Sequence, residues 1–253
     1  MRALVISDIH ANLPALEAVL AAAPQHDVVW NLGDVVGYDA NPNEVVDLAR
    51  DLGGIVVRGN HDRACSGTMH FSEYRELSQL ASYTADWTQR ALTKQNREWL
   101  SRLPQGPLKP IPRKVLCAHG SPWNEDAYTF FRDDAFVAFR SSRARIILCG
   151  HTHRQVGWSW NGKEMIPLKP EYKSKTEASK IEVPLGSRSR YVLNPGSVGQ
   201  PRDGDWRAAF AVYDDNEATL TRCRVPYKVL TAQRRILRAE LPEILATRLR
   251  DGT

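Results

Sequence analysis

Five short apolar segments of the chain each end at residues of the kinds that bind metal ions. The segments are 3–7, 28–33, 55–59, 115–118 and 146–150. The residues that follow them are, in order, Asp8 and His10; Asp34; Asn60, His61 and Asp62; His119; and His151 and His153. Continuous apolar runs of this length predict buried strands. Because ligands of open parallel sheets gather outside the carboxyl ends of the strands, we expect one site, built by five loops at one edge of one sheet.

The first part of the chain alternates strand patterns with helix patterns. Asn12 is a typical N-cap for a helix, and Pro42 begins a second helix that Gly53 and Gly54 end. Residues 72–103 have a helical pattern, a proline-rich connector covers 104–112, and another helix is predicted over 134–141. Alternation of this kind is typical of a parallel sheet covered by helices.

After residue 153 the pattern changes to successive strands. They are predicted over 155–160, 163–168, 190–193, 207–213 and 218–225. We expect them to form an antiparallel sheet that packs against the first sheet. The overall prediction is a single α/β (α+β) domain over 1–253, a four-layer sandwich in which two mixed sheets pack face to face and helices flank them.

Two segments do not fit the strand pattern. Residues 169–190 are polar and rich in lysine and glutamate, which predicts a disordered loop, a solvated hairpin or an insertion. The tail over 227–253 predicts one or two short helices broken at Pro242.

Composition narrows the class of protein only a little. The net charge is +5, but the basic residues are spread along the chain, so nucleic acid as a partner is only weakly indicated. No apolar stretch is long enough to span a bilayer and the first residues do not form a signal peptide, which predicts a cytoplasmic protein. The four cysteines form no C-x-x-C pair, so we expect free thiols.

The polar residues at the strand ends have the chemistry of a transition-metal site. Asp8 and His10 are two residues apart, as are His151 and His153, and in an extended segment such residues point to the same side. Imidazole and carboxylate ligands suit Mn, Fe, Zn or Ni, whereas the absence of cysteine disfavours a structural zinc site. Seven candidate ligands exceed the needs of one ion. Two ions that share one carboxylate are the economical arrangement.

The order of these motifs resembles a known family. Asp8-Ile9-His10, Gly33-Asp34, Gly59-Asn60-His61-Asp62, His119-Gly120 and Gly150-His151-Thr152-His153 are similar to the motifs of calcineurin-like metallophosphoesterases. The segments 7–13, 33–38 and 194–199 resemble the small bacterial and archaeal phosphodiesterase branch of that family.

The resemblance implies a role for each motif residue. One ion would be bound by Asp8, His10, Asp34 and His153, and the other by Asp34, Asn60, His119 and His151, so that Asp34 bridges. A metal-bridging hydroxide would attack the phosphorus atom. His61 would act as general acid or phosphate contact, with Asp62 orienting it. The two divalent ions are expected to be manganese first, with iron, zinc or nickel as alternatives.

The predicted function is hydrolysis of small phosphodiesters, with cyclic nucleotides among the candidate substrates. The alternatives are a phosphomonoesterase or protein phosphatase, a nuclease, a dinucleoside polyphosphate hydrolase, and an inactive binding scaffold of the same fold. Tyr38 and Arg154 adjoin the motifs, as substrate contacts or as packing and surface residues. The loop at Tyr38 and the segment 169–190 are expected to set the choice of substrate. The sequence leaves the oligomeric state open.

Overall fold

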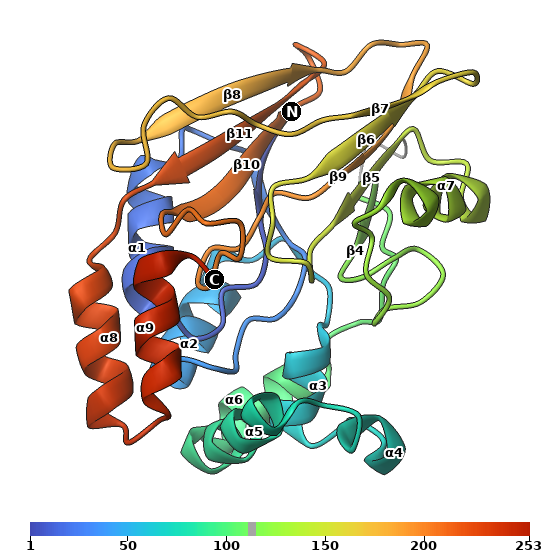
Figure 1. Ribbon diagram of the computed structural model, residues 1–253. Coiled ribbons are helices and arrows are strands. Elements are labelled where there is room, and N and C mark those ends of the chain that lie inside the picture. The colour runs from blue at the N-terminus through green and yellow to red at the C-terminus, as the bar shows by residue number, and fades with distance from the viewer. Residues whose placement is uncertain (111–114) are drawn as a thin grey trace.

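The computed structural model describes residues 1–110 and 115–253, so part of the predicted connector, including Pro112, lies outside the described residues. Its strands form two mixed sheets (Figure 1). The six-stranded sheet has, in spatial order, β3 (Ile55–Val56), β2 (Val28–Asn31), β1 (Arg2–Ile6), β10 (Ala208–Asp214), β11 (Thr219–Val225) and β8 (Ser179–Pro184). The five-stranded sheet has the order β4 (Val115–Ala118), β5 (Ile146–Cys149), β9 (Arg190–Leu193), β6 (Gly157–Trp160) and β7 (Met165–Pro167).

Each sheet combines a parallel part with an antiparallel part. In the first sheet β1, β2 and β3 run parallel, whereas β10 pairs antiparallel with β1 in the register Leu4 to Val212. In the second sheet β4, β5 and β9 run parallel, and β6 and β7 continue antiparallel. The prediction that the second half forms a sheet of its own is therefore wrong. Its strands divide between the two sheets and extend both.

Side chains that alternate along the strands divide the core into layers. Ala3 and Val5 of β1 lie in the cluster between the sheets, whereas Leu4 and Ile6 face the helices on the other side. The inter-sheet cluster includes Trp30 and Tyr213, whose rings stack with their centroids 5.4 Å apart. Because side chains of a strand alternate between the two faces, a strand in a central layer must be apolar on both.

Helices flank the two sheets, and α5 and α6 pack on α2 and α3, away from the strands. The bounds are α1 (Leu13–Ala22), α2 (Pro42–Leu52), α3 (Asn60–Ser66), α4 (Phe71–Tyr74), α5 (Gln79–Ala91), α6 (Lys94–Ser101), α7 (Arg132–Ser141), α8 (Val229–Arg238) and α9 (Glu243–Asp251). In Figure 1, α1, α2, α8 and α9 lie on the side of the six-stranded sheet, and α7 packs on the five-stranded sheet through Phe139. The predicted four-layer α/β sandwich is confirmed.

Polar caps explain where the helices begin. The Asn12 side chain accepts a hydrogen bond from the amide of Ala15, as the sequence predicted. Within the predicted helical segment 72–103, the hydroxyls of Ser78 and Thr93 cap two separate helices, α5 and α6. The long helical pattern is therefore three short helices, since each side-chain cap begins a new one.

The polar segment 169–190 is ordered, contrary to the expectation of disorder, and contains β8 at the edge of the six-stranded sheet. Strand β8 alternates in burial, with Val183 facing the core. Buried arginines hold the flanking backbone: Arg222 donates to the carbonyl oxygens of Leu168 and Val156 at 2.6 and 2.8 Å. The segment is therefore part of a sheet, with polar residues on its solvent face.

No described helix has both the length and the apolar character required to cross a membrane.

Candidate metal centre

The candidate metal ligands lie where the two sheets meet. Asp8, His10, Asp34 and Asn60 follow strands β1, β2 and β3 of the six-stranded sheet, whereas the other three follow strands of the five-stranded sheet. These three are His119 after β4, and His151 and His153 after β5. The prediction of one edge of one sheet is therefore wrong. The ligands come from the carboxyl ends of the parallel strands of both sheets.

The backbone of the ligand loops is left-handed, not extended as the spacing suggested. Asp8, His10 and Asp34 have φ values of 53°, 50° and 55°, and His151 and His153 have 65° and 57°. Residues other than glycine adopt this conformation rarely, and such strain is concentrated at functional sites. The members of each pair do converge, but tight turns bring them together.

A neighbouring loop holds these turns in place. The hydroxyl of Ser197 donates to the carbonyl oxygen of Asp8 at 2.7 Å, and the amide of Gly199 donates to the same oxygen at 3.0 Å. The side-chain amide of Asn194 donates to the carbonyl oxygen of Gly150 at 2.6 Å. The segment 194–199 thus connects the loop of Asp8 with the loop of His151.

Four buried side chains form the first candidate site. One ligand atom from each of Asp8, His10, Asp34 and His153 lies within 4.8 Å of the others. The Nε2 atoms of His10 and His153 are 3.0 Å apart, and His153 Nε2 is 3.6 Å from a carboxylate oxygen of Asp8. These donor atoms surround one small volume.

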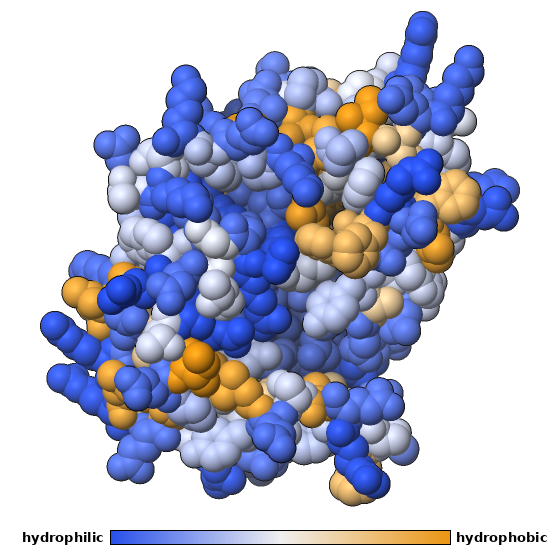
Figure 2. Space-filling model, viewed as in Figure 1, coloured by the Kyte–Doolittle hydropathy of each residue, from blue (hydrophilic) through white to orange (hydrophobic). Residues whose placement is uncertain are grey.

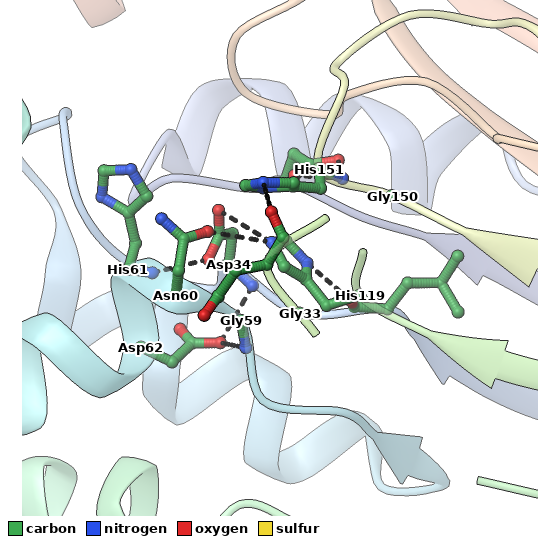
Figure 3. Close-up of polar contacts among 12 residues, drawn as sticks. Gly33, Asp34, Gly59, Asn60, His61, Asp62, His119, Gly150 and His151 are labelled. Carbon is green, nitrogen blue, oxygen red and sulfur yellow. Dashed lines mark hydrogen bonds and ion pairs between the residues drawn. The ribbon is translucent and has the colours of Figure 1, made fainter. Parts of the chain in front are cut away.

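A second candidate site shares Asp34 with the first. Asp34, His119 and His151 also bring their ligand atoms within 4.8 Å of one another. His119 Nε2 lies 3.3 Å from Asp34 and 3.2 Å from the side-chain oxygen of Asn60, as Figure 3 shows. All seven predicted ligands therefore contribute to two adjoining clusters, and Asp34 is the shared member.

Backbone carbonyl groups fix which ring nitrogen faces each cluster. In His10, His119 and His153, Nδ1 lies 3.1, 2.9 and 2.7 Å, respectively, from a backbone carbonyl oxygen. Because a carbonyl oxygen only accepts hydrogen bonds, Nδ1 must carry the ring proton and donate it. Their Nε2 atoms therefore face the clusters. In His151 the roles are reversed, because its Nε2 donates to the carbonyl oxygen of Asp126 at 3.1 Å. Such outer contacts orient metal-binding histidines.

The close approach of His10 and His153 fits a shared cation. Both rings carry their proton on Nδ1, and burial lowers the pKa of each well below its usual value. Two unprotonated Nε2 atoms thus face each other at 3.0 Å with no proton between them. Two imidazole nitrogens about 2.1 Å from one ion, at roughly a right angle, would be about 3.0 Å apart. The donor set therefore fits a divalent transition ion.

The second cluster carries a proton when no ion is bound. Burial disfavours the charged form of His119, but the Asp34 carboxylate outweighs it and raises the pKa of His119 to about 10. Burial likewise opposes ionisation of Asp34, yet the charge of His119 holds its pKa well below the usual value. His151 remains neutral, because burial and the charge of His119 lower its pKa to about 3. An ion that binds here must displace the proton of His119.

His61 lies beside the clusters but belongs to neither. Its ring packs against those of His10 and Tyr38, with centroids 4.8 and 4.4 Å away. Its Nδ1 is buried and has no hydrogen-bond partner among the described residues. Burial lowers the pKa of His61 to about 4, so the ring is neutral near pH 7. His61 also lines the cavity beside the clusters, so a substrate in that cavity would meet its ring.

Asp62 does not contact the His61 ring as expected. Its carboxylate accepts hydrogen bonds from the amides of Gly59, Asp34 and Val35 at 2.9, 2.9 and 2.8 Å (Figure 3). The residue is fully buried and caps the first turn of α3. Asp62 thus fixes the loop of Asp34 against the start of α3, and it positions His61 only through the backbone.

Several residues around the clusters have no signal in the sequence pattern. Tyr128 stacks on His151 with ring centroids 4.3 Å apart. The Arg63 side chain pairs with Asp126, whose carbonyl oxygen orients His151. Arg202 lines the same cavity of about 330 Å³ as Asp34, His61 and His151. Tertiary packing brings these side chains to the site, so their spacing along the chain could not reveal them.

Comparison with known proteins supports this arrangement of ligands. A model of the calcineurin-like phosphoesterase family matches residues 1–173. The chain belongs to this family. An uncharacterized protein of Methanocaldococcus jannaschii is 33% identical to this calcineurin-like phosphoesterase over 97% of the chain and 96% of its own length.

Two solved structures resemble this calcineurin-like phosphoesterase over its full length. A metallophosphoesterase from Sphaerobacter thermophilus is 36% identical, with a TM-score of 0.84, and the match covers 100% of this chain and 99% of the other. A hypothetical protein from Pyrococcus horikoshii OT3 has a TM-score of 0.77 at 21% identity, with 100% and 98% covered, and this likeness concerns the fold. The family and fold predicted from the motifs are both confirmed.

Proposed function

We propose that the protein is a dinuclear metal-dependent phosphodiesterase that hydrolyses small phosphodiesters. The observation that carries the proposal is the pair of buried ligand clusters that share Asp34. Paired divalent ions polarise a phosphoryl oxygen, ionise a water molecule as nucleophile and stabilise both oxygens of an in-line displacement. Manganese is the ion that we propose first, because imidazole and carboxylate ligands suit it and no cysteine belongs to either cluster.

The residues of the chain divide the remaining tasks. Asp8, His10, Asp34 and His153 would hold one ion, and Asp34 would share the other with Asn60, His119 and His151. His61 lines the cavity outside both clusters, where it can donate a hydrogen bond or a proton to the leaving oxygen. A neutral ring in the free protein acquires its proton more readily once a phosphoryl anion lies nearby.

The shape of the surface favours a small substrate with a planar group. Next to the metal cavity, a cleft of about 770 Å³ is lined by Trp123, Tyr128 and Phe131. Their side chains are 42, 55 and 68% exposed, which is unusual for aromatic residues. Exposed aromatic rings can stack on a nucleobase, so cyclic nucleotides remain the leading candidate class.

The test is hydrolysis of bis-p-nitrophenyl phosphate with added Mn²⁺. The unmodified protein should be active, and Asp34→Asn and His119→Ala should each lower kcat/KM by at least about 100-fold because a metal ligand is lost. Asp39→Asn is the matched control, since this carboxyl is buried beside the site but belongs to neither cluster. Unchanged hydrolysis in the two ligand variants would refute the proposal.

Substrate profiling distinguishes the proposed activity from its alternatives. Phosphomonoesters, a phosphopeptide, single-stranded DNA and RNA, and a dinucleoside polyphosphate are assayed beside cyclic nucleotides under the same conditions. If the protein prefers any of these compounds over the cyclic nucleotides, the assignment as a phosphodiesterase of small diesters is replaced, and the metal centre is kept. Failure to bind metal or to hydrolyse any of these compounds would favour the inactive scaffold. The cytoplasmic location stays a proposal, which cell fractionation tests.

A further inference from the structure

A strongly basic pocket of about 710 Å³ adjoins the metal cavity. Six cationic side chains line it: Arg154, Lys169, Lys175, Arg202, Arg224 and Arg248. They come from the ligand loop after β5, from the segment 169–190, from the loop before β10, from β11 and from α9. Figure 2 shows hydrophilic residues gathered in the hollow at the centre of this face, next to an apolar patch.

The two carboxylates of this pocket are already paired. Arg224 forms an ion pair with Asp203, and Asp205 binds Arg207, whose guanidinium lies 2.5 Å from it. Within residues 1–110 and 115–253, the ion pairs include no carboxylate partner for the other five cations. Lys175 donates to the carbonyl oxygen of Gly204 at 2.9 Å, which is not a charged partner. The side chains of the pocket therefore carry an excess of positive charge that its side-chain carboxylates do not neutralise.

Arg202 connects this pocket to the metal centre. It lines both cavities, and its amide donates to the carbonyl oxygen of the metal-ligand candidate His153 at 3.1 Å. Its guanidinium donates to Gln200 at 2.8 Å and lies 5.6 Å from the centre of the Tyr38 ring. The Nε of Arg202 is buried and has no partner in the part of the chain that the structure describes. A fixed cation with an unused donor is suited to an anion.

Arg248 brings a second guanidinium from α9 toward the same space. Arg202 and Arg248 line the same pocket, and burial and the charge of Arg202 both lower the pKa of Arg248. Its Nε donates to an oxygen of Thr253 at 2.8 Å, and Thr253 lines the same pocket. An anion between the two arginines would relieve their repulsion.

We propose that this basic pocket binds a second phosphate group of the substrate, so that the preferred substrates are small phosphoesters with a further phosphate beyond the scissile one. This inference rests on the proposed function. We favour a small molecule over nucleic acid because the cations gather around one pocket, which residues of the segment 169–175 and of α9 help to line. The aromatic cleft, which Arg154 and Arg202 also line, would hold the planar part of the same substrate.

The experiment compares two chromogenic substrates that differ by one phosphate. Thymidine 5′-(p-nitrophenyl phosphate) is assayed with and without a 3′-phosphate, in excess Mn²⁺. For the unmodified protein, kcat/KM should be about 10-fold or more higher with the 3′-phosphate, as one charge-assisted contact allows. Arg248→Gln and Lys169→Gln should each reduce this preference to under about 3-fold.

Matched controls come from exposed cations outside the pocket, one on α9 and one in a nearby turn. Arg250, with its side chain 78% exposed, lies on α9 outside the pocket, and Lys163 is exposed in the turn before β7. Arg250→Gln and Lys163→Gln should keep the full preference. Lys169 is itself exposed, so its replacement tests the pocket even if Arg248→Gln is unstable.

The outcomes separate this inference from the function on which it rests. If the unmodified protein hydrolyses both substrates equally, or if the preference survives in both pocket variants, the second-phosphate site is refuted and the phosphodiesterase remains. If the protein hydrolyses neither substrate, the proposed function itself fails. Faster cleavage of a single-stranded oligonucleotide than of both thymidine substrates would also overturn the proposal. The basic pocket would then bind the phosphates of a nucleic-acid backbone.

Discussion

Replacing His61 by asparagine tests whether this ring protonates the leaving group. The side chain is only 5% exposed, and burial lowers its pKa to about 4. At pH 7 about one ring in a thousand is protonated in the free protein, so the acid role depends on the charge of the bound phosphoryl group. General acid catalysis by a positioned side chain contributes about 10²–10⁴-fold. The kcat/KM of His61→Asn should decrease by a factor in this range only when the leaving oxygen needs a proton.

The assay compares two leaving groups. Uridine 2′,3′-cyclic phosphate releases an alkoxide that requires protonation, whereas bis-p-nitrophenyl phosphate releases a stable phenolate. For His61→Asn we expect kcat/KM to fall by about 10²–10⁴-fold on the cyclic nucleotide and by less than about 10-fold on the chromogenic diester. His70→Asn, at an exposed histidine, is the control and should retain both activities.

An equal loss on both substrates would refute the acid role. It would indicate that His61 contacts the phosphoryl group in both reactions without transferring a proton. Metal content should be unchanged in either case, because the His61 ring belongs to neither cluster and His61 contacts Asp34 through its backbone amide, at 2.9 Å.

Two further predictions concern the same centre. Below its raised pKa of about 10, His119 keeps a proton that competes with the metal, so metal affinity should rise about tenfold per pH unit between pH 6 and 8. Calorimetric titration with Mn²⁺ in buffers of different ionisation enthalpy measures the number of protons released. A metal affinity that does not change with pH would contradict the prediction. A β-carbon at Gly37 would lie 2.6 Å from Nδ1 of His61, so Gly37→Ala should lower activity on the cyclic nucleotide with metal content unchanged. Gly162→Ala, with the same φ of +93° but open space around it, controls for backbone strain, and an equal loss in both variants would exclude displacement of His61.

The sequence predicted which residues are candidate ligands, but not the sheets and the backbone conformations that bring them together. Apolar runs that end in Asp, Asn and His identify strand ends, since burial on both faces requires such runs. They do not indicate which sheet a strand joins, and β4 and β5 could equally have extended the sheet of β1. The spacing of Asp8 and His10 suggested an extended backbone, whereas both residues are left-handed. That conformation depends on contacts with 194–199, far along the chain.

Two other differences have a similar origin. Strand β8 was interpreted as a polar loop because an edge strand buries only one face, and only Val183 of its residues is fully buried. The family resemblance implies that Asp62 orients the His61 ring. In the fold, its carboxylate instead accepts hydrogen bonds from four backbone amides, three in the segment 34–36 and one at Gly59. Arg202 comes shortly after the segment 194–199 but belongs to none of the motifs, and tertiary packing brings its side chain to the site.

The most direct test of the central claim is the number of metal ions bound per chain. The protein is loaded with Mn²⁺ and desalted, and metal and protein are then quantified by elemental mass spectrometry. We expect two ions per chain in the unmodified protein, one in His151→Ala, and essentially none in Asp34→Asn, because Asp34 belongs to both clusters. One ion or none in the unmodified protein, or two ions retained without the Asp34 carboxylate, would contradict the shared dinuclear centre.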